Sequence, residues 1–147
     1  MIECVPLTAN DFEAWLPLWR SYLTFYKTTV DEPTTRLTFD RLTNGGEPMG
    51  AFIARDEGGH AIGTVHWILH RSCWTQGDYC YLQDLYVDAS RRNAGIGRRL
   101  IEAVYGLARS RSCSRVYWLT HETNTDAMKL YDKVADRSGF LQYRKIL

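Results

Sequence analysis

The N-terminal third of the chain shows two hydrophobic patterns, one typical of a strand and one of a helix. Residues 2–7 are a short, largely apolar segment that we interpret as a strand. Apolar residues then recur at spacings of three and four, which is typical of a helix with one buried face; they are Phe12, Trp15, Leu16, Trp19, Tyr22, Leu23 and Tyr26. Pro17 falls inside this helix, and because proline lacks the N–H of a helical bond, we expect a kink or the start of a second segment.

The rest of the chain continues the pattern. A second short helix is predicted over residues 35–42, followed by strands over 51–55 and 61–70, with Asp56-Glu57-Gly58-Gly59 as their hairpin turn. A turn over 72–78 leads into a strand that ends at Val87. A helix over 95–110, a strand over 115–120, a helix over 124–134 and a last strand over 140–146 complete the chain.

Composition narrows the class of protein. The 147 residues fit a single domain, residues 1–147, and 45% of them are hydrophobic. The net charge of +1 excludes a global basic field that recruits nucleic acid. No apolar run approaches the roughly 18 residues of a membrane-spanning helix. The start shows no basic segment followed by an apolar one, so we expect no secretion signal and a cytoplasmic location.

Cysteines and histidines leave two alternatives open. Cys4, Cys73, Cys80 and Cys113 are scattered, and reduced thiols are favoured over disulfides. His66 and His70 share one face of a predicted strand that His60 precedes. A metal site there is the weaker interpretation, and ordinary half-exposed histidines are the favoured one.

The most informative segment is residues 92–100, where a strand is followed by a basic loop, two glycines and a helix. A helix N-terminus leaves N–H groups that attract anions, and Gly95 and Gly97 let the backbone approach a phosphate. Arg91, Arg92, Arg98 and Arg99 add positive charge. The segment therefore predicts a diphosphate site; the alternative is a loop with solvated arginines. The P-loop and dinucleotide motifs do not fit, because Leu100 replaces the third glycine of the latter.

Two motifs carry a family resemblance. Arg92, Gly95 and Gly97 fill R/Q-x-x-G-x-G/A, and after the next strand Asn124, Ala127 and Tyr131 fill N-x-x-A-x-x-x-Y. The chain thereby resembles the GNAT superfamily of N-acetyltransferases over residues 81–147, and in the N-terminal half by layout. Residues 82–87 are similar to the branch that acetylates polyamines and histone-type amines.

The resemblance implies an α/β (α+β) fold with a central mixed, mostly antiparallel sheet of about six strands and about four flanking helices. It implies acetyl-CoA as cofactor and transfer of its acetyl group to a primary amine, such as a polyamine or amino acid. The residues implied to bind acetyl-CoA are Leu85, Tyr86, Val87, Arg92, Asn93, Ala94, Gly95, Ile96, Gly97, Arg98, Asn124, Ala127 and Tyr131. Acetylation of protein lysines or N-termini, and a catalytically weak acyl-CoA sensor, are the alternatives.

The resemblance also suggests catalytic roles. Tyr131 would be the general acid beside the CoA sulfur, the alternative being a core tyrosine. The branch usually has a glutamate where this chain has Gln83, which cannot accept a proton. Asp84 is therefore favoured as the base over Glu122, although strand alternation turns Asp84 to the opposite face unless a bulge intervenes. A base acting through water, or an unassisted amine, stays open.

The same layout suggests an acceptor site and an assembly. Tyr22 and Tyr26 of the first helix, Asp31 and Glu32 of the next loop, and Gln83 and Asp84 are the predicted acceptor-binding residues. The partner would be a small amine, with no nucleic acid and no membrane. A homodimer is expected, with Leu141, Tyr143 and Leu147 as candidate contacts of a C-terminal strand.

Overall fold

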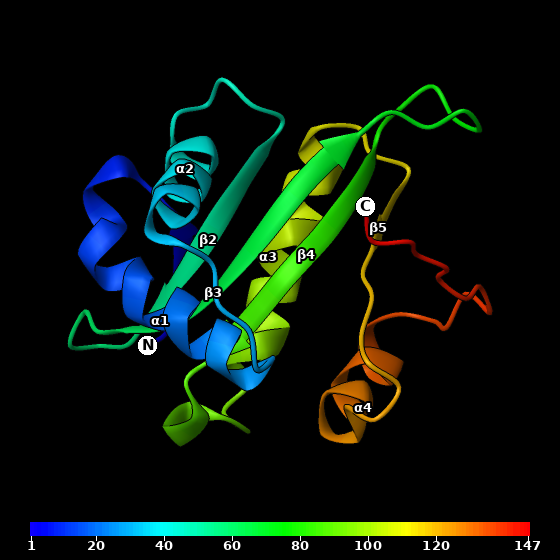
Figure 1. Cartoon of the computed structure of the whole chain (residues 1–147). Coiled ribbons are helices and arrows are strands. Elements are labelled where there is room, and N and C mark those ends of the chain that lie inside the picture. The colour runs from blue at the N-terminus through cyan, green and yellow to red at the C-terminus, as the bar shows by residue number, and fades with distance from the viewer.

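The computed structural model describes residues 1–147 as a five-stranded sheet with helices on both faces (Figure 1). The elements are β1 (Glu3–Pro6), η1 (Ala9–Asp11), α1 (Phe12–Phe25), α2 (Glu32–Thr43), β2 (Met49–Arg55), β3 (Ala61–His70), β4 (Tyr79–Val87), η2 (Ala89–Arg91), α3 (Ile96–Ser110), β5 (Arg115–Tyr117) and α4 (Thr125–Val134). The strand order is β1-β2-β3-β4-β5; the first three pairings are antiparallel and β4–β5 is parallel.

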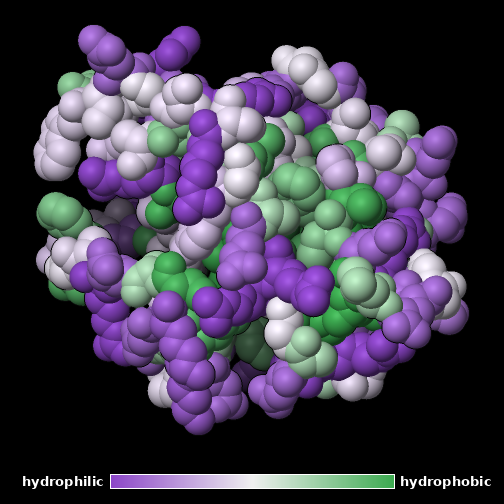
Figure 2. Space-filling view, turned by 180° about the vertical axis from the view of Figure 1, so that it is seen from behind, coloured by the Kyte–Doolittle hydropathy of each residue, from purple (hydrophilic) through white to green (hydrophobic).

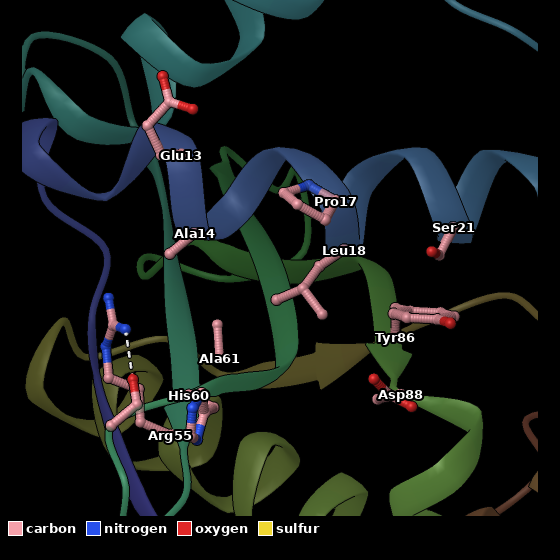
Figure 3. A pocket seen from close by; sticks show the side chains of 11 residues that line it. Glu13, Ala14, Pro17, Leu18, Ser21, Arg55, His60, Ala61, Tyr86 and Asp88 are labelled. Atoms are coloured by element: carbon pink, nitrogen blue, oxygen red, sulfur yellow. Dashed lines mark hydrogen bonds between the residues drawn. The ribbon is translucent and has the colours of Figure 1, made fainter.

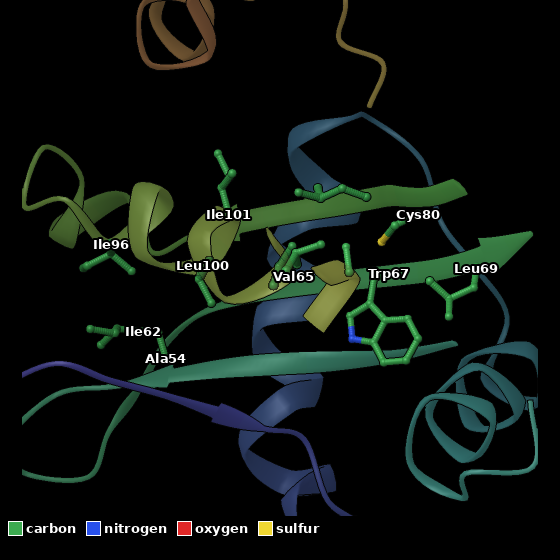
Figure 4. Packing of buried hydrophobic residues seen from close by; sticks show 12 residues of the cluster. Ala54, Ile62, Val65, Trp67, Leu69, Cys80, Ile96, Leu100 and Ile101 are labelled. Carbon is green, nitrogen blue, oxygen red and sulfur yellow. The ribbon is translucent and has the colours of Figure 1, made fainter. Parts of the chain in front are cut away.

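Two hydrophobic clusters hold the helices on the sheet. On one face, α3 buries Leu100, Ile101 and Val104 against Val65 and Leu82 of the sheet (Figure 4). On the other face, α1 and α2 pack against β2 and β3, and Trp15 and Trp19 of α1 stack at 5.6 Å between ring centroids. Full burial of one large apolar side chain is worth about 1.5–3 kcal/mol, so these clusters supply most of the stability.

The α1 helix confirms the aromatic stripe and corrects one expectation. It runs from Phe12 to Phe25 as one continuous helix with Pro17 inside it, so a second segment does not begin there. Trp15 and Leu18, on either side of the proline, are buried. Tertiary packing of this face therefore outweighs the hydrogen bond that Pro17 cannot donate.

The β4 strand contains a bulge. His66 pairs with Asp84 but the next residue of β3, Trp67, pairs with Leu82, so Gln83 is an extra residue in β4. Because side chains alternate along a strand, an extra residue turns everything after it to the other face. Asp84 therefore lies on the α1 face, although plain alternation would have put it on the face that Leu82 shares with α3.

The C-terminal part departs most from the sequence-based expectation. β5 ends at Tyr117 rather than at residue 120, and residues 140–146 form no strand, so the sheet has five strands instead of about six. In Figure 1 this segment runs as a coil to the C-terminus. Leu141 and Tyr143 are 83% and 93% exposed. A strand needs a partner for its backbone groups, and the segment pairs with no strand of its own chain.

Smaller differences have local causes. α2 begins at Glu32 instead of residue 35, because Asp31 caps it by accepting the Thr34 N–H at 2.8 Å.

The cysteines are unpaired. No group of histidine, cysteine, aspartate and glutamate side chains could hold a metal ion. None of the helices has the length and apolar character needed to cross a membrane. The face seen in Figure 2 carries apolar side chains toward its middle among hydrophilic ones.

Candidate active site

The loop between β4 and α3 has the backbone geometry of an anion site. Gly95 takes the left-handed conformation, φ 78°, and is the N-cap of α3, without a side-chain hydrogen bond to cap the helix. The first N–H groups of an α-helix have no partner within the helix. Those of Ile96, Gly97 and Arg98 can therefore bind an anion, and the helix dipole favours negative charge there. The backbone thus fits the diphosphate of coenzyme A.

The four arginines in and next to this loop each contact another group of the protein. Arg91 pairs with Asp56 at 2.7 Å and Arg98 with Glu102 at 3.1 Å. Arg92 Nε donates to the Val87 carbonyl at 3.2 Å, and Arg99 donates to the Ile2 carbonyl at the same distance. Their charge is next to the loop as expected, but their side chains are engaged with the protein, so the backbone N–H groups are the stronger candidates for a phosphate contact. Asn93 and Ala94 are exposed in this loop, and Asn93 has φ 68°.

Gly97 joins the two motifs in space. A Cβ at this position would lie 3.3 Å from Leu130 Cδ2 and 3.8 Å from Val87 Cγ2. The glycine therefore lets α4 approach the first turn of α3 closely. Tyr131 follows Leu130, so its helix lies next to the first turn of α3, where the diphosphate site is predicted.

β4 and β5 diverge at the same end of the sheet. They pair only from Tyr79 to Tyr81 on β4, opposite Arg115 to Tyr117, while β4 continues to Val87. The β5-facing backbone groups of Leu85, Tyr86 and Val87 are therefore not used by β5. This agrees with a cofactor arm lying between the two strands. The side chains of Leu85, Tyr86 and Val87 pack against the two core clusters.

Tyr131 lies beside this opening with a free hydroxyl. Its ring packs edge-on against Trp118, with centroids 5.4 Å apart, and its hydroxyl makes no hydrogen bond within the chain. Burial, with a smaller contribution from Tyr26, raises the pKa of Tyr131 to about 12. The hydroxyl therefore keeps its proton at neutral pH and is free to donate it.

Asp84 is the centre of a hydrogen-bonded network on the α1 face. Tyr22 donates its hydroxyl to Oδ1 at 2.7 Å, and His66 Nδ1 lies 2.9 Å from Oδ2. Trp15 Nε1 donates to His66 Nε2 at 3.0 Å. Burial and the Asp84 charge raise the pKa of Tyr22, and the same two causes raise the pKa of Tyr26. Both hydroxyls therefore stay protonated around the carboxylate.

His66 was missed as a functional residue. It is 3% exposed rather than half-exposed, because it faces Trp15 and Trp19 under α1. A buried polar side chain needs a hydrogen-bond partner. The sequence held one signal, a histidine between Val65 and Trp67 in an apolar strand, but it could not name the partners.

The other predicted acceptor residues do not reach this network. Asp31 caps α2, and Glu32 forms an exposed pair with Arg20 at 3.6 Å. Gln83 is exposed at the bulge, and Glu122 is exposed in the turn before α4 without a hydrogen bond or ion pair. The structure therefore brings Tyr22 and Tyr26 to Asp84 and leaves the remaining candidates apart.

Asn124 and Ala127 occupy the start of α4. Asn124 is the N-cap of the helix, but its side chain does not cap it and donates instead to Thr120 Oγ1 at 3.3 Å. The side-chain capping hydrogen bond that is common for asparagine at this position is therefore absent. The predicted contact of Asn124 with the cofactor stays a prediction. Ala127 is half-buried one turn before Tyr131.

A shallow cavity of about 400 Å³ lies between α1 and the β2–β3 hairpin (Figure 3). Pro17 and Leu18 of α1 and Tyr86 and Asp88 at the end of β4 are among its lining residues. Asp84 and Tyr131 do not line it. The predicted catalytic residues therefore lie outside this cavity.

Fold and site define an acyltransferase of the expected class, and comparisons with known proteins agree. A model of the acetyltransferase (GNAT) family matches residues 12–135. The chain is 37% identical to a D-amino-acid N-acetyltransferase of Saccharomyces cerevisiae, over 92% of this chain and 85% of the relative. It is 35% identical to a thialysine N-epsilon-acetyltransferase of Caenorhabditis elegans, over 90% and 81%.

A solved ribosomal-protein-alanine N-acetyltransferase from Brucella melitensis has the same fold, with a TM-score of 0.84 at 21% identity and full coverage of both chains. The chain belongs to the GNAT family. It is an acetyl-CoA-dependent N-acetyltransferase, as the two motifs predicted.

Proposed function

We propose that this enzyme acetylates the primary amine of a small molecule, such as an amino acid or a polyamine. The observation that supports the proposal is the position of β4. The edge that β5 leaves unpaired is the predicted place for the cofactor, and the α1 face holds the Asp84 carboxylate, which accepts a hydrogen bond from Tyr22. Asp84 has a side chain only 15% exposed. An ammonium group is the natural partner for such a carboxylate. The names of the two relatives support small acceptors.

Each step has a residue. When bound, acetyl-CoA supplies the acetyl group as a thioester. The N-terminus of α3 would hold the diphosphate, and the N–H groups of Leu85 or Val87, which β5 does not use, would polarise the thioester carbonyl. Asp84 binds the ammonium, accepts its proton and leaves the amine free to attack. Tyr131 would donate from its hydroxyl to the departing sulfur, and the second proton that the nitrogen loses as the amide forms balances the one that the sulfur gains.

Asp84 is the favoured base because hydrogen bonds with Tyr22 and His66 hold its carboxylate on the α1 face of β4. Glu122, the second candidate, is exposed in a turn. Replacing each by its amide is a matched test. Asp84→Asn should lower kcat/KM for the amine mainly at low pH, where the acceptor is protonated, and the loss should shrink as pH rises. Glu122→Gln should stay near wild type; the reverse ranking would exchange the two roles.

The acceptor class is testable directly. A panel of polyamines, D- and L-amino acids, aminoglycosides and lysine peptides is followed by release of free thiol from acetyl-CoA. We expect turnover with small amines and little with peptides. Preferential turnover of peptides would overturn the proposed substrate class, and no turnover with any amine would favour a binding role.

We further propose a homodimer and a cytoplasmic location. The exposed apolar side chains at the C-terminus, Phe140, Leu141, Tyr143, Ile146 and Leu147, support a second copy as their cover. β5 is an edge strand. Light scattering at micromolar concentration tests the dimer, and a monomer would refute it. The unpaired cysteines support a reducing compartment; cell fractionation tests the location.

A further inference from the structure

The network around Asp84 contains a residue that none of the proposed steps uses. His66 joins the core at Trp15 to the carboxylate at Asp84. We infer that His66 is a positioning residue, which orients the Asp84 carboxylate for the amine, and that Trp15 enables it by fixing the histidine tautomer. The inference rests on the role of Asp84 in binding the acceptor that is proposed above.

The hydrogen-bond directions determine where the His66 proton lies. An indole N–H only donates, so His66 Nε2, 3.0 Å from Trp15 Nε1, is the acceptor. A neutral imidazole has one donor nitrogen and one acceptor nitrogen. Its N–H is therefore at Nδ1, 2.9 Å from Asp84 Oδ2, and it donates to the carboxylate. With the proton on Nε2 instead, the His66 N–H and the Trp15 N–H would point at each other, and neither could accept. Trp15 is fully buried and has no other acceptor in this network.

The two donors to Asp84 come from different elements, which fixes the plane of the carboxylate. Tyr22 of α1 donates to Oδ1 at 2.7 Å, and His66 of β3 donates to Oδ2. A carboxylate offers about four acceptor positions, so two remain for an ammonium group. Without His66 the carboxylate keeps one tether and can rotate about it. Catalysis is sensitive to such small displacements of a positioning group.

Rigidity of the anchor favours this role over an incidental contact. The His66 side chain is 4% exposed, and its ring lies 5.6 Å from the ring of Trp19 between centroids. The bulge at Gln83 is what turns Asp84 toward this histidine. The bulge and the histidine therefore act together: one selects the face of the sheet, and the other sets the orientation.

A double-mutant cycle separates this role from a purely structural one. The variants are His66→Phe, Asp84→Asn and the double variant, with acetyl-CoA turnover followed for the best amine of the panel. A hydrogen bond to a charged group supports a loss of about ten- to a hundredfold in kcat/KM for His66→Phe. In the Asp84→Asn background the same change should cost less than about twofold. KM for acetyl-CoA should stay unchanged.

His70→Phe is the matched control, because His70 lies on the same strand and face but hydrogen-bonds Tyr117 at 2.7 Å instead of Asp84. It should keep wild-type kcat/KM. Equal losses from His66→Phe in both backgrounds, or no loss in the wild-type background, would overturn the inference. If Asp84→Asn keeps full activity, Asp84 has no role in the reaction and the inference about His66 falls with it. The proposed function would still stand in that case, provided that the wild-type enzyme acetylates small amines.

Nitrogen NMR of labelled histidine gives a readout that does not depend on activity or on the folding of a core variant. His66 should carry its proton on Nδ1 in the wild-type protein at neutral pH. Trp15→Phe, which removes the indole donor and keeps an aromatic ring, should allow the second tautomer and lower kcat/KM in the same direction as His66→Phe. A wild-type spectrum with the proton on Nε2 would overturn the inference.

Discussion

The hydroxyl of Tyr131 is the group whose removal tests the proposed chemistry with the least structural change. Tyr131→Phe keeps the ring that packs against Trp118 at 5.4 Å. It removes an oxygen that makes no hydrogen bond in the chain, so no buried partner is left unsatisfied. We therefore expect a change in unfolding free energy within about 0.5 kcal/mol, and unchanged acetyl-CoA affinity.

The size of the catalytic loss follows from the acidity of the hydroxyl. General acid catalysis is typically worth about 10²–10⁴-fold. A thiol has a pKa near 8.5, and the pKa of Tyr131 is raised to about 12, so full proton transfer to the sulfur is uphill. The hydroxyl then acts mainly as a hydrogen-bond donor to the charge that develops on sulfur. The expected loss in kcat is about ten- to a hundredfold, or roughly 1.4–2.7 kcal/mol.

The assay is steady-state thiol release with saturating acetyl-CoA and the best amine. Because Tyr131 holds its proton far above neutrality, the ratio of wild-type to variant rates should be constant between about pH 6 and pH 10. Tyr105→Phe, which removes another tyrosine hydroxyl on the α3 side, is the control and should keep kcat. If Tyr131→Phe turns over at the wild-type rate, the tyrosine is structural and the mechanism is wrong.

Three further predictions follow from the same structure. Gly95→Val puts a β-branched residue at φ 78° and should abolish acetyl-CoA binding in calorimetry. The control Gly106→Val, farther along α3, should keep the affinity. Unchanged affinity in a folded Gly95→Val would contradict the diphosphate site. The pKa of Asp56 is lowered to about 2, first by the His60 N–H, so its stabilisation exists above about pH 4 and is lost toward pH 2; urea unfolding of Asp56→Asn should show a deficit at pH 7 that vanishes near pH 2. The raised pKa of Tyr131 contributes stability below about pH 10 that is lost as pH rises toward 12, so unfolding of wild type should weaken more steeply there than that of Tyr131→Phe, and parallel curves would contradict it.

Short-range patterns predicted most of the elements correctly. The aromatic stripe of α1, the hairpin at Asp56–Gly59 and the glycine-capped start of α3 are local features, because period, turn residues and backbone freedom act within a few residues. The two motifs also predicted the family, which the comparisons confirm. Assignments that needed a partner failed: the predicted strand over 140–146 is rich in apolar residues, but nothing in the chain pairs with it.

The candidate site shows the same division between sequence and tertiary structure. The sequence by itself determined the family through its two motifs, because their spacing sets Gly95 and Gly97 at the start of one helix and Tyr131 on another helix; the roles of these residues stay predictions. Only the tertiary structure decided the face of Asp84, since a single extra residue in β4, Gln83, inverts the alternation and is visible only in the pairing with β3. It also decided that His66 is buried against Trp15 and Asp84, because hydrogen bonds between residues 51 and 18 positions apart depend on packing that no local pattern encodes.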